Sequence, residues 1–322
     1  MSALSANPAK HNRMLARFAW FVVGYFILVV LWGAVVRATG SGGGCGASWP
    51  LCNGYLNPLH HPRLATIVEF AHRQSTTVAT CLMLALAVGT FRTTPPGHRA
   101  RKAALWTLLL LVIEALLGMM LVLRGWVENN DSVGRVIAQA VHFTNTLVLM
   151  AALALTAWFL GQRPTKSSKR ASASRLTAWG AILATMLVGA TGALAALADT
   201  LFPSPTLTAA FAQDFTAHAP VLIRMRWLHP AAAIVALLCI VALLRASSGR
   251  PIARVVLALL GLQFALGIAD VLLLAPVWMQ ILHLLGADLY WIALVLLAGE
   301  TIWPVAQVSE PTAAARQPAT VA

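Results

Sequence analysis

Residues 37–73 read RATGSGGGCGASWPLCNGYLNPLHHPRLATIVEFAHR and join the first two long apolar runs of the chain. The segment holds a glycine run and two cysteines, and it ends in Glu69 and His72, where the second apolar run begins. Residues three apart lie on one face of a helix. A carboxylate and an imidazole at the mouth of a membrane span are costly to keep there, so their presence indicates chemistry.

Composition predicts an all-α membrane protein. The 322 residues are 59% hydrophobic and only 10% charged, whereas soluble domains carry about 25% charged residues. Apolar runs recur at about the 20-residue length that crosses a bilayer, and the first of them is expected to be retained rather than cleaved as a signal peptide. We predict eight transmembrane helices, at about residues 18–36, 65–91, 103–123, 136–160, 176–198, 227–245, 252–274 and 279–300.

The basic residues predict the orientation of these spans. The net charge is +13, but the lysines and arginines fall in short clusters between apolar runs, which argues for membrane topology and against nucleic-acid binding. Because cytoplasmic loops are rich in basic residues, both termini are expected in the cytoplasm and the loop with Cys45 and Cys52 outside. The expected parts are a tail at 1–17, bundles at 18–160 and 176–302 joined by a basic linker at 161–175, and a disordered tail at 303–322.

Two halves of the chain resemble each other. Glu114-Ala-Leu-Leu-Gly118 in the third span parallels Gln263-Phe-Ala-Leu-Gly267 in the seventh, and Gly33-Ala34 parallels Gly189-Ala190. Four spans return the chain to its starting side, so the repeats would have the same orientation. The prediction is two pseudo-symmetric four-helix bundles.

Four histidines lie at one depth in the even-numbered spans, two in each half: His72, His142, His229 and His283. A single histidine in a membrane helix is often a hydrogen-bonding contact between helices, but four at one depth favour ligands. Bundle cores hold cofactors between facing helices. Structural zinc usually takes four N or S ligands together, and copper more often recruits Met or Cys as well. The spacing therefore favours two haem-like sites, His72 with His142 and His229 with His283.

Only the first half has a carboxylate beside its histidine. Aligning His72 with His229 sets Glu69 opposite Arg226, so the two sites are expected to have different tasks. Glu69 could transfer protons or stabilise developing positive charge. The alternative is an ordinary helix-surface ion pair with Arg73. Three further acids in or near the spans, Glu114, Asp270 and Asp288, receive no predicted role.

Arginines near the outer ends of the spans are candidates for binding the anionic propionates of a porphyrin, because guanidinium groups pair well with carboxylates. Arg224 and Arg226 are the candidates for the second site. Arg37, Arg73 and Arg135 are weaker candidates for the first.

Cys45 and Cys52 are expected to form a disulfide, because their loop faces an oxidising compartment. The bond would staple the loop as a lid over the first site. The alternative is thiol exchange with an external partner.

These residues together resemble the haem A synthase family, in its bacterial branch with a cysteine pair. The resemblance rests on the segment 33–42, on the cysteine pair with Trp49-Pro50, and on Glu69-x-x-His72-Arg73. It continues through the three later histidines and covers about residues 18–300.

The resemblance implies an enzyme that oxidises the C8 methyl group of haem O to a formyl group, giving haem A for terminal oxidases. His72 and His142 would bracket the substrate haem, His229 and His283 would bind the iron of haem b, and Glu69 would be catalytic. A bacterial inner-membrane location, haem O synthase as a partner and a separate electron donor are also implied.

Two other classes of protein remain as alternatives. A di-haem cytochrome b that only relays electrons explains the four histidines, but neither the single Glu69 nor the cysteine loop. A transporter built on two repeats could use histidines as proton relays, but the spans show no pair of Gly/Pro-broken helices.

Overall fold

The computed structural model describes residues 8–58, 62–162 and 172–303. It confirms the all-α prediction, with eight helices that are long and apolar enough to cross a membrane, so the chain is a multi-pass membrane protein. These helices are α1 (Pro8–Ala38), α2 (Leu64–Thr93), α3 (Arg99–Leu123), α4 (Val133–Gly161), α5 (Ser172–Leu201), α8 (Leu228–Ala246), α9 (Pro251–Leu272) and α10 (Val277–Ile302).

Some helix boundaries differ from those expected. Helix α1 begins at Pro8 rather than near residue 18, so it extends through the basic segment. The connection between α5 and α8 contains two short helices that the apolar pattern did not indicate, α6 (Leu207–Asp214) and α7 (Val221–Arg224). A short 3-10 turn, η1 (Ser41–Gly43), follows α1. Residues 163–171 of the expected linker and 304–322 of the expected tail lie outside the described residues.

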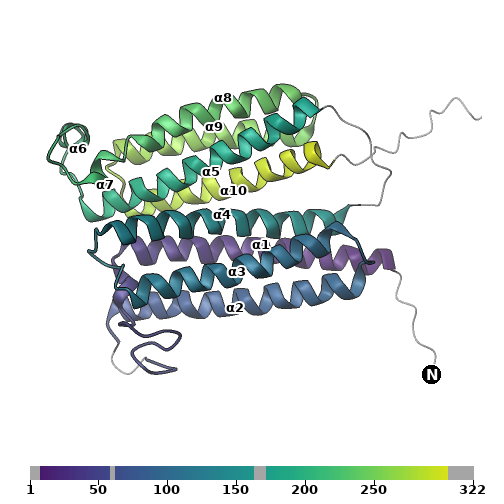
Figure 1. The fold of residues 1–322 in the computed structure, drawn as a ribbon, viewed down its shortest axis with the longest axis horizontal. Helices are drawn as coiled ribbons and strands as arrows, with labels where there is room; N and C mark the ends of the chain where they lie inside the picture. Colours follow the sequence, from purple (N-terminus) through teal and green to yellow (C-terminus); the bar gives the residue numbers. More distant parts are fainter. Residues whose placement is uncertain (1–7, 59–61, 163–171, 304–322) are drawn as a thin grey trace, which may run out of the picture.

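The helices form two groups of four, which is compatible with the predicted repeat (Figure 1). Helices α1–α4 make one group, and α5, α8, α9 and α10 make the other. Helices α1 and α4 of the first group pack against α5 and α10 of the second. The start of α1 and the end of α10 lie at the same end of the molecule. The opposite end, called the loop end below, carries the segment 39–58 (the cysteine loop), the α3–α4 connection, and α6 and α7.

Polar contacts tie the two groups together across an otherwise apolar interface. The indole nitrogen of Trp291 in α10 donates to the Leu147 carbonyl in α4, at 2.8 Å. Toward the loop end, the guanidinium of Arg37 in α1 donates to the Ala196 carbonyl (2.6 Å) and the Thr200 hydroxyl (2.7 Å) in α5, and to the amide oxygen of Gln280 in α10 (2.8 Å). Arg37 thus joins the two halves, and its role as a weaker propionate candidate stays a prediction.

Candidate functional site

Each of the four histidines packs against a glycine on the neighbouring odd-numbered span. A Cβ atom on that glycine would stand 2.9 to 4.0 Å from the histidine Cε1 atom, so a larger residue would crowd the ring in most cases. The pairs are Gly33 with His72 (3.1 Å), Gly118 with His142 (4.0 Å), Gly192 with His229 (2.9 Å) and Gly267 with His283 (3.0 Å).

These contacts correct one detail of the internal repeat. The structural counterpart of Gly33 is Gly192, whereas Gly189 lies against the side chains of Leu147 and Phe143. The expected match of Gly33 with Gly189 is therefore wrong by about one helical turn. A Gly-Ala pair occurs at both places in α5, so composition could not distinguish them.

His229 and His283 face each other in the second half. Their ring centroids are 6.3 Å apart and the ring planes are perpendicular. An imidazole nitrogen binds a metal at about 2 Å, so two axial rings with centres roughly 1 Å behind their nitrogens have centres about 6 Å apart. His229 Nδ1 lies 3.0 Å from the Val188 carbonyl; donating there leaves Nε2 free for a metal. The pair thus fits two axial ligands of one iron.

His72 on α2 and His142 on α4 occupy the corresponding place in the first half. The Nδ1 atoms of both rings are buried and have no hydrogen-bond partner among the described residues. A buried ring nitrogen without a partner is costly. If Nδ1 carries the ring proton, Nε2 is the nitrogen that remains for a metal. The two rings correspond to the second pair by their glycine contacts, His72 with Gly33 and His142 with Gly118.

Glu114 in α3 was given no role by sequence reasoning, yet it lies against His142. Its Oε1 atom is 3.6 Å from His142 Nδ1, too long for a hydrogen bond but within ion-pair range. The side-chain amide of Asn145 donates to Oε2 at 2.6 Å, and the Thr146 hydroxyl donates to Oε1. The parallel between Glu114–Gly118 and Gln263–Gly267 was the signal that could have identified it.

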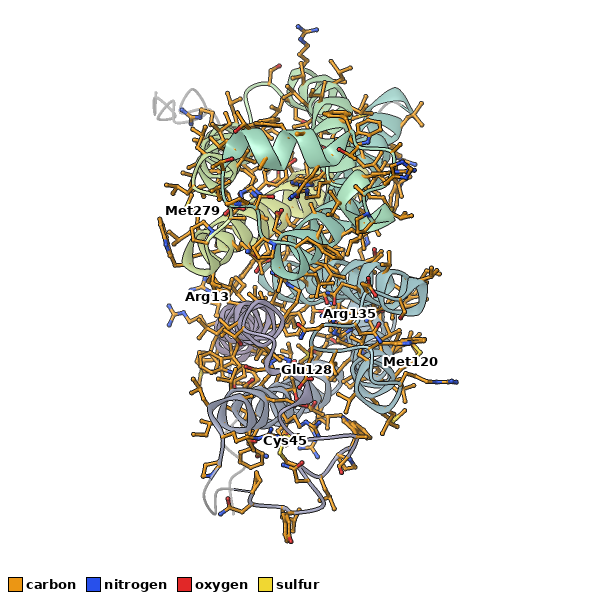
Figure 2. The ribbon with its side chains drawn as sticks, turned by 90° about the vertical axis from the view of Figure 1, so that its left-hand side faces the viewer. Arg13, Cys45, Met120, Glu128, Arg135 and Met279 are labelled. Carbon is orange, nitrogen blue, oxygen red and sulfur yellow. A yellow bond between two sulfur atoms is a disulfide. The ribbon has the colours of Figure 1, made fainter. Side chains whose placement is uncertain are left out.

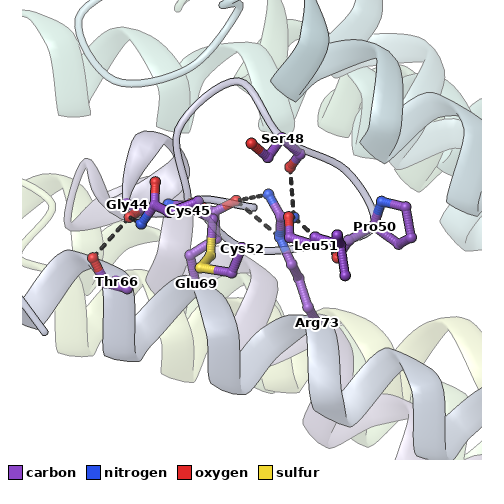
Figure 3. The surroundings of a disulfide bond; sticks show 10 residues. Gly44, Cys45, Ser48, Pro50, Leu51, Cys52, Thr66, Glu69 and Arg73 are labelled. Carbon is purple, nitrogen blue, oxygen red and sulfur yellow. Dashed lines mark hydrogen bonds and ion pairs between the residues drawn. A yellow bond between two sulfur atoms is a disulfide. The ribbon is translucent and has the colours of Figure 1, made fainter. Parts of the chain in front are cut away.

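Glu69 is buried under the cysteine loop and binds it directly (Figure 3). Its Oε2 atom accepts a hydrogen bond from the Cys45 backbone amide at 2.7 Å. Its Oε1 atom accepts from Arg73, from Nε at 3.1 Å and from Nη2 at 2.5 Å. The predicted alternative, an ion pair with Arg73, is thus present, but it is buried rather than on the helix surface.

Arg73 continues this network into the loop. Its Nη1 atom donates to the carbonyls of Ser48 (2.7 Å) and Leu51 (2.8 Å), as Figure 3 shows. Cys45 and Cys52 form the expected disulfide, and both side chains are buried. The disulfide, Arg73 and Glu69 together fix the loop over the start of α2.

At the loop end of the second half, Arg226 is already paired with two carboxylates. It donates to Asp199 at 2.9 Å and to Asp214 at 2.7 and 2.8 Å. Arg224 makes one long hydrogen bond, 3.4 Å to the Ala217 carbonyl. Of the two predicted propionate candidates, Arg224 therefore has more unused donors.

Arg135 is buried at the loop end of the first half (Figure 2). Its Nη1 atom donates to the backbone carbonyls of Glu128 and Asn130, and its Nε atom has no partner within the described part of the chain. Arg135 precedes His142 by seven residues, which is two helical turns on one face. A buried guanidinium with an unused donor suits an anionic group above His142.

Over residues 16–295 the chain matches the family described as cytochrome oxidase assembly protein, COX15-CtaA. The chain belongs to this family. Its relatives include Heme A synthase of Bacillus pumilus, 37% identical over 146 residues (45% of this chain, 43% of that protein). Heme A synthase of Symbiobacterium thermophilum is 34% identical over 175 residues (52% and 54%). The family membership confirms the resemblance to haem A synthases.

Another relative of this chain has a different name. Protoheme IX farnesyltransferase of Thermus thermophilus is 42% identical over 291 residues, which cover 88% of this chain and 48% of that protein. The chain thus spans about half the length of the curated relatives it matches.

Proposed function

We propose that the chain is a haem A synthase, which oxidises the C8 methyl group of haem O to a formyl group. The observation that carries the proposal is the set of four histidines, each packed against a glycine, of which His229 and His283 face each other. In the first half, Glu114 lies against His142, and Glu69 precedes His72 by three residues on the same helix. The relatives named Heme A synthase support the same reading.

In the second half, His229 and His283 would hold the iron of haem b. The ring separation of 6.3 Å supports this assignment. Such a haem supplies one-electron transfer when bound. The residues of the chain hold the ring planes in place, with Gly192 and Gly267 leaving room for the imidazoles and Val188 orienting His229.

In the first half, His72 and His142 would bracket the substrate haem O. Glu69 is one helical turn from His72, where a carboxylate can exchange a proton or stabilise positive charge near the substrate. Its bond to the Cys45 amide links this group to the cysteine loop. The loop would then cover the substrate and exclude water from the outer side, as a lid held by its disulfide.

Propionate binding differs between the halves in this proposal. Arg135 has a buried, unused donor in the first half, and Arg224 has unused donors in the second. Arg226 would contribute to propionate binding only indirectly, because its guanidinium is already paired with Asp199 and Asp214. Arginine suits these places because its planar fork matches a carboxylate.

The expected setting is a bacterial inner membrane, with both termini cytoplasmic and the cysteine loop outside. Haem O carries a farnesyl chain, so its supplier is a protohaem farnesyltransferase. The Protoheme IX farnesyltransferase of Thermus thermophilus contains a segment 42% identical to this chain, which makes up 48% of that protein. We propose that a haem O synthase delivers the substrate and that a separate donor supplies electrons.

The test is co-expression with a haem O producer, followed by extraction and chromatography of the bound haems. The wild-type protein is expected to yield haem A, and Glu69→Gln to retain bound haem but form no haem A. A wild-type protein that holds haem b alone would instead be the electron relay. Haem A formation by Glu69→Gln at the wild-type rate would remove Glu69 from the chemistry.

A further inference from the structure

We propose that Glu114 is a positioning residue that makes His142 a more electron-rich ligand than its counterpart His283, which faces the neutral Gln263. The inference deepens the proposed function, since it assumes a haem iron on His142. It rests on side-chain contacts that differ between the two halves at equivalent places.

The carboxylate of Glu114 is held in place to face the ring. Asn145 and Thr146 each donate to one of its oxygens, so it is an acceptor on both sides. His142 Nδ1, 3.6 Å away, is buried and has no hydrogen bond among the described residues. A small rotation of the ring would let Nδ1–H donate to Glu114 and leave Nε2 for the iron.

The corresponding contact in the second half has the opposite character. The amide nitrogen of Gln263 is 3.2 Å from both ring nitrogens of His283 and 3.1 Å from the His283 carbonyl. An amide nitrogen is a donor and carries no negative charge. His283 therefore lacks the anionic acceptor that His142 has.

The supporting residues change together with the acid. Counting from each histidine, Asn145 and Thr146 correspond to Gly286 and Ala287. A Cβ atom at Gly286 would stand 2.6 Å from the Gln263 amide oxygen, so glycine gives the amide its room. The first half has two donors for a carboxylate, and the second half has neither, which makes the difference a property of the whole site rather than of one residue.

The physical consequence concerns the iron. A carboxylate that accepts the Nδ1 proton raises the basicity of the ligating nitrogen. A more basic axial ligand stabilises the ferric state, which lowers the reduction potential of that haem. The haem of the first site would therefore have a lower reduction potential than it would have with a neutral residue at position 114.

The experiment is a reciprocal exchange followed by redox titration of the purified, haem-loaded protein with optical detection. Glu114→Gln is expected to raise the midpoint potential of the first haem, and Gln263→Glu to lower that of the second. A tenfold change in the reduction equilibrium corresponds to about 59 mV for one electron, and we expect at least that for Glu114→Gln. Glu114→Asp keeps the charge and is expected to shift the potential less.

The lipid-facing change Leu116→Met on the same helix is the matched control and should leave both potentials unchanged. Equal potentials in wild type and Glu114→Gln, with haem still bound, would overturn the inference. So would a Glu114→Asp shift as large as that of Glu114→Gln, because packing rather than charge would then be responsible. A failure of the proposed function itself gives a different result. If His142 does not bind a haem iron, His142→Ala will leave the haem content and the spectrum unaltered.

Discussion

Replacing Arg73 by alanine is expected to open the cysteine loop and expose its disulfide. The Arg73 guanidinium is the one side chain that binds both Glu69, at 2.5 and 3.1 Å, and the loop carbonyls of Ser48 and Leu51, at 2.7 and 2.8 Å, in the described part of the chain. The substitution would leave Glu69, which is 3% exposed, without its counter-charge.

The magnitude follows from these contacts. Removing one partner of a buried ion pair costs about 3–5 kcal/mol, because the other charge stays buried and unpaired. If about 3 kcal/mol of this bears on loop opening, the open population rises roughly a hundred-fold, at 1.4 kcal/mol per factor of ten. The loop can open alone, since local openings cost less than global unfolding.

The assay is the rate at which a small thiol reduces the disulfide, followed by alkylation and mass analysis. Cys45 and Cys52 are 0% and 1% exposed, so reduction reports opening. Arg63→Ala removes the same charge from an exposed position at the start of the same helix and is expected to reduce at the wild-type rate. A folded Arg73→Ala protein reduced less than threefold faster than wild type would refute the reasoning.

Three further outcomes are expected. Gly44→Ala should also accelerate disulfide reduction, because a Cβ there would overlap the backbone of α2, whereas Gly24→Ala, with open space around it, should not. Arg37→Ala removes three hydrogen bonds between the halves; with each charged bond worth about 1.5–3 kcal/mol, thermal unfolding in detergent should occur at a lower temperature. Gly192→Ala should displace an imidazole and lower the haem content in a pyridine haemochrome assay, whereas Gly180→Ala should not.

The spans and the depth of the histidines were predictable because both depend on local pattern. A membrane helix needs a fixed length of apolar sequence, and a histidine in such a run is conspicuous at any distance from its partner. The disulfide was predictable for the same reason, since the two cysteines are seven residues apart in one loop. Their locations follow from the chain alone.

What the pattern could not give is which side chains meet across helices. Asn145 and Glu114 are 31 positions apart, and Arg37 and Gln280 are 243 apart; their contacts depend on helix rotation and packing, which apolar periodicity leaves undetermined in a bilayer. The wrong match of Gly33 with Gly189 instead of Gly192 has the same origin, because it too depends on which glycine faces a histidine. Arg226 was predicted as a propionate ligand because the sequence did not reveal that Asp199, near the end of α5, and Asp214, at the end of α6, contact it.

One scaffold can hold two sites of unlike chemistry because ligand geometry and local charge belong to different residues. The contacts of His142 with Gly118 and of His283 with Gly267 fix where the rings lie, and they are common to both halves. The residue that sets the local charge lies one helical turn before each glycine on the odd-numbered span. It is the carboxylate Glu114 beside His142 and the neutral amide Gln263 beside His283. We expect a substitution there to change the electrostatics while each histidine keeps its glycine contact, so the two haems can differ in reduction potential on one scaffold.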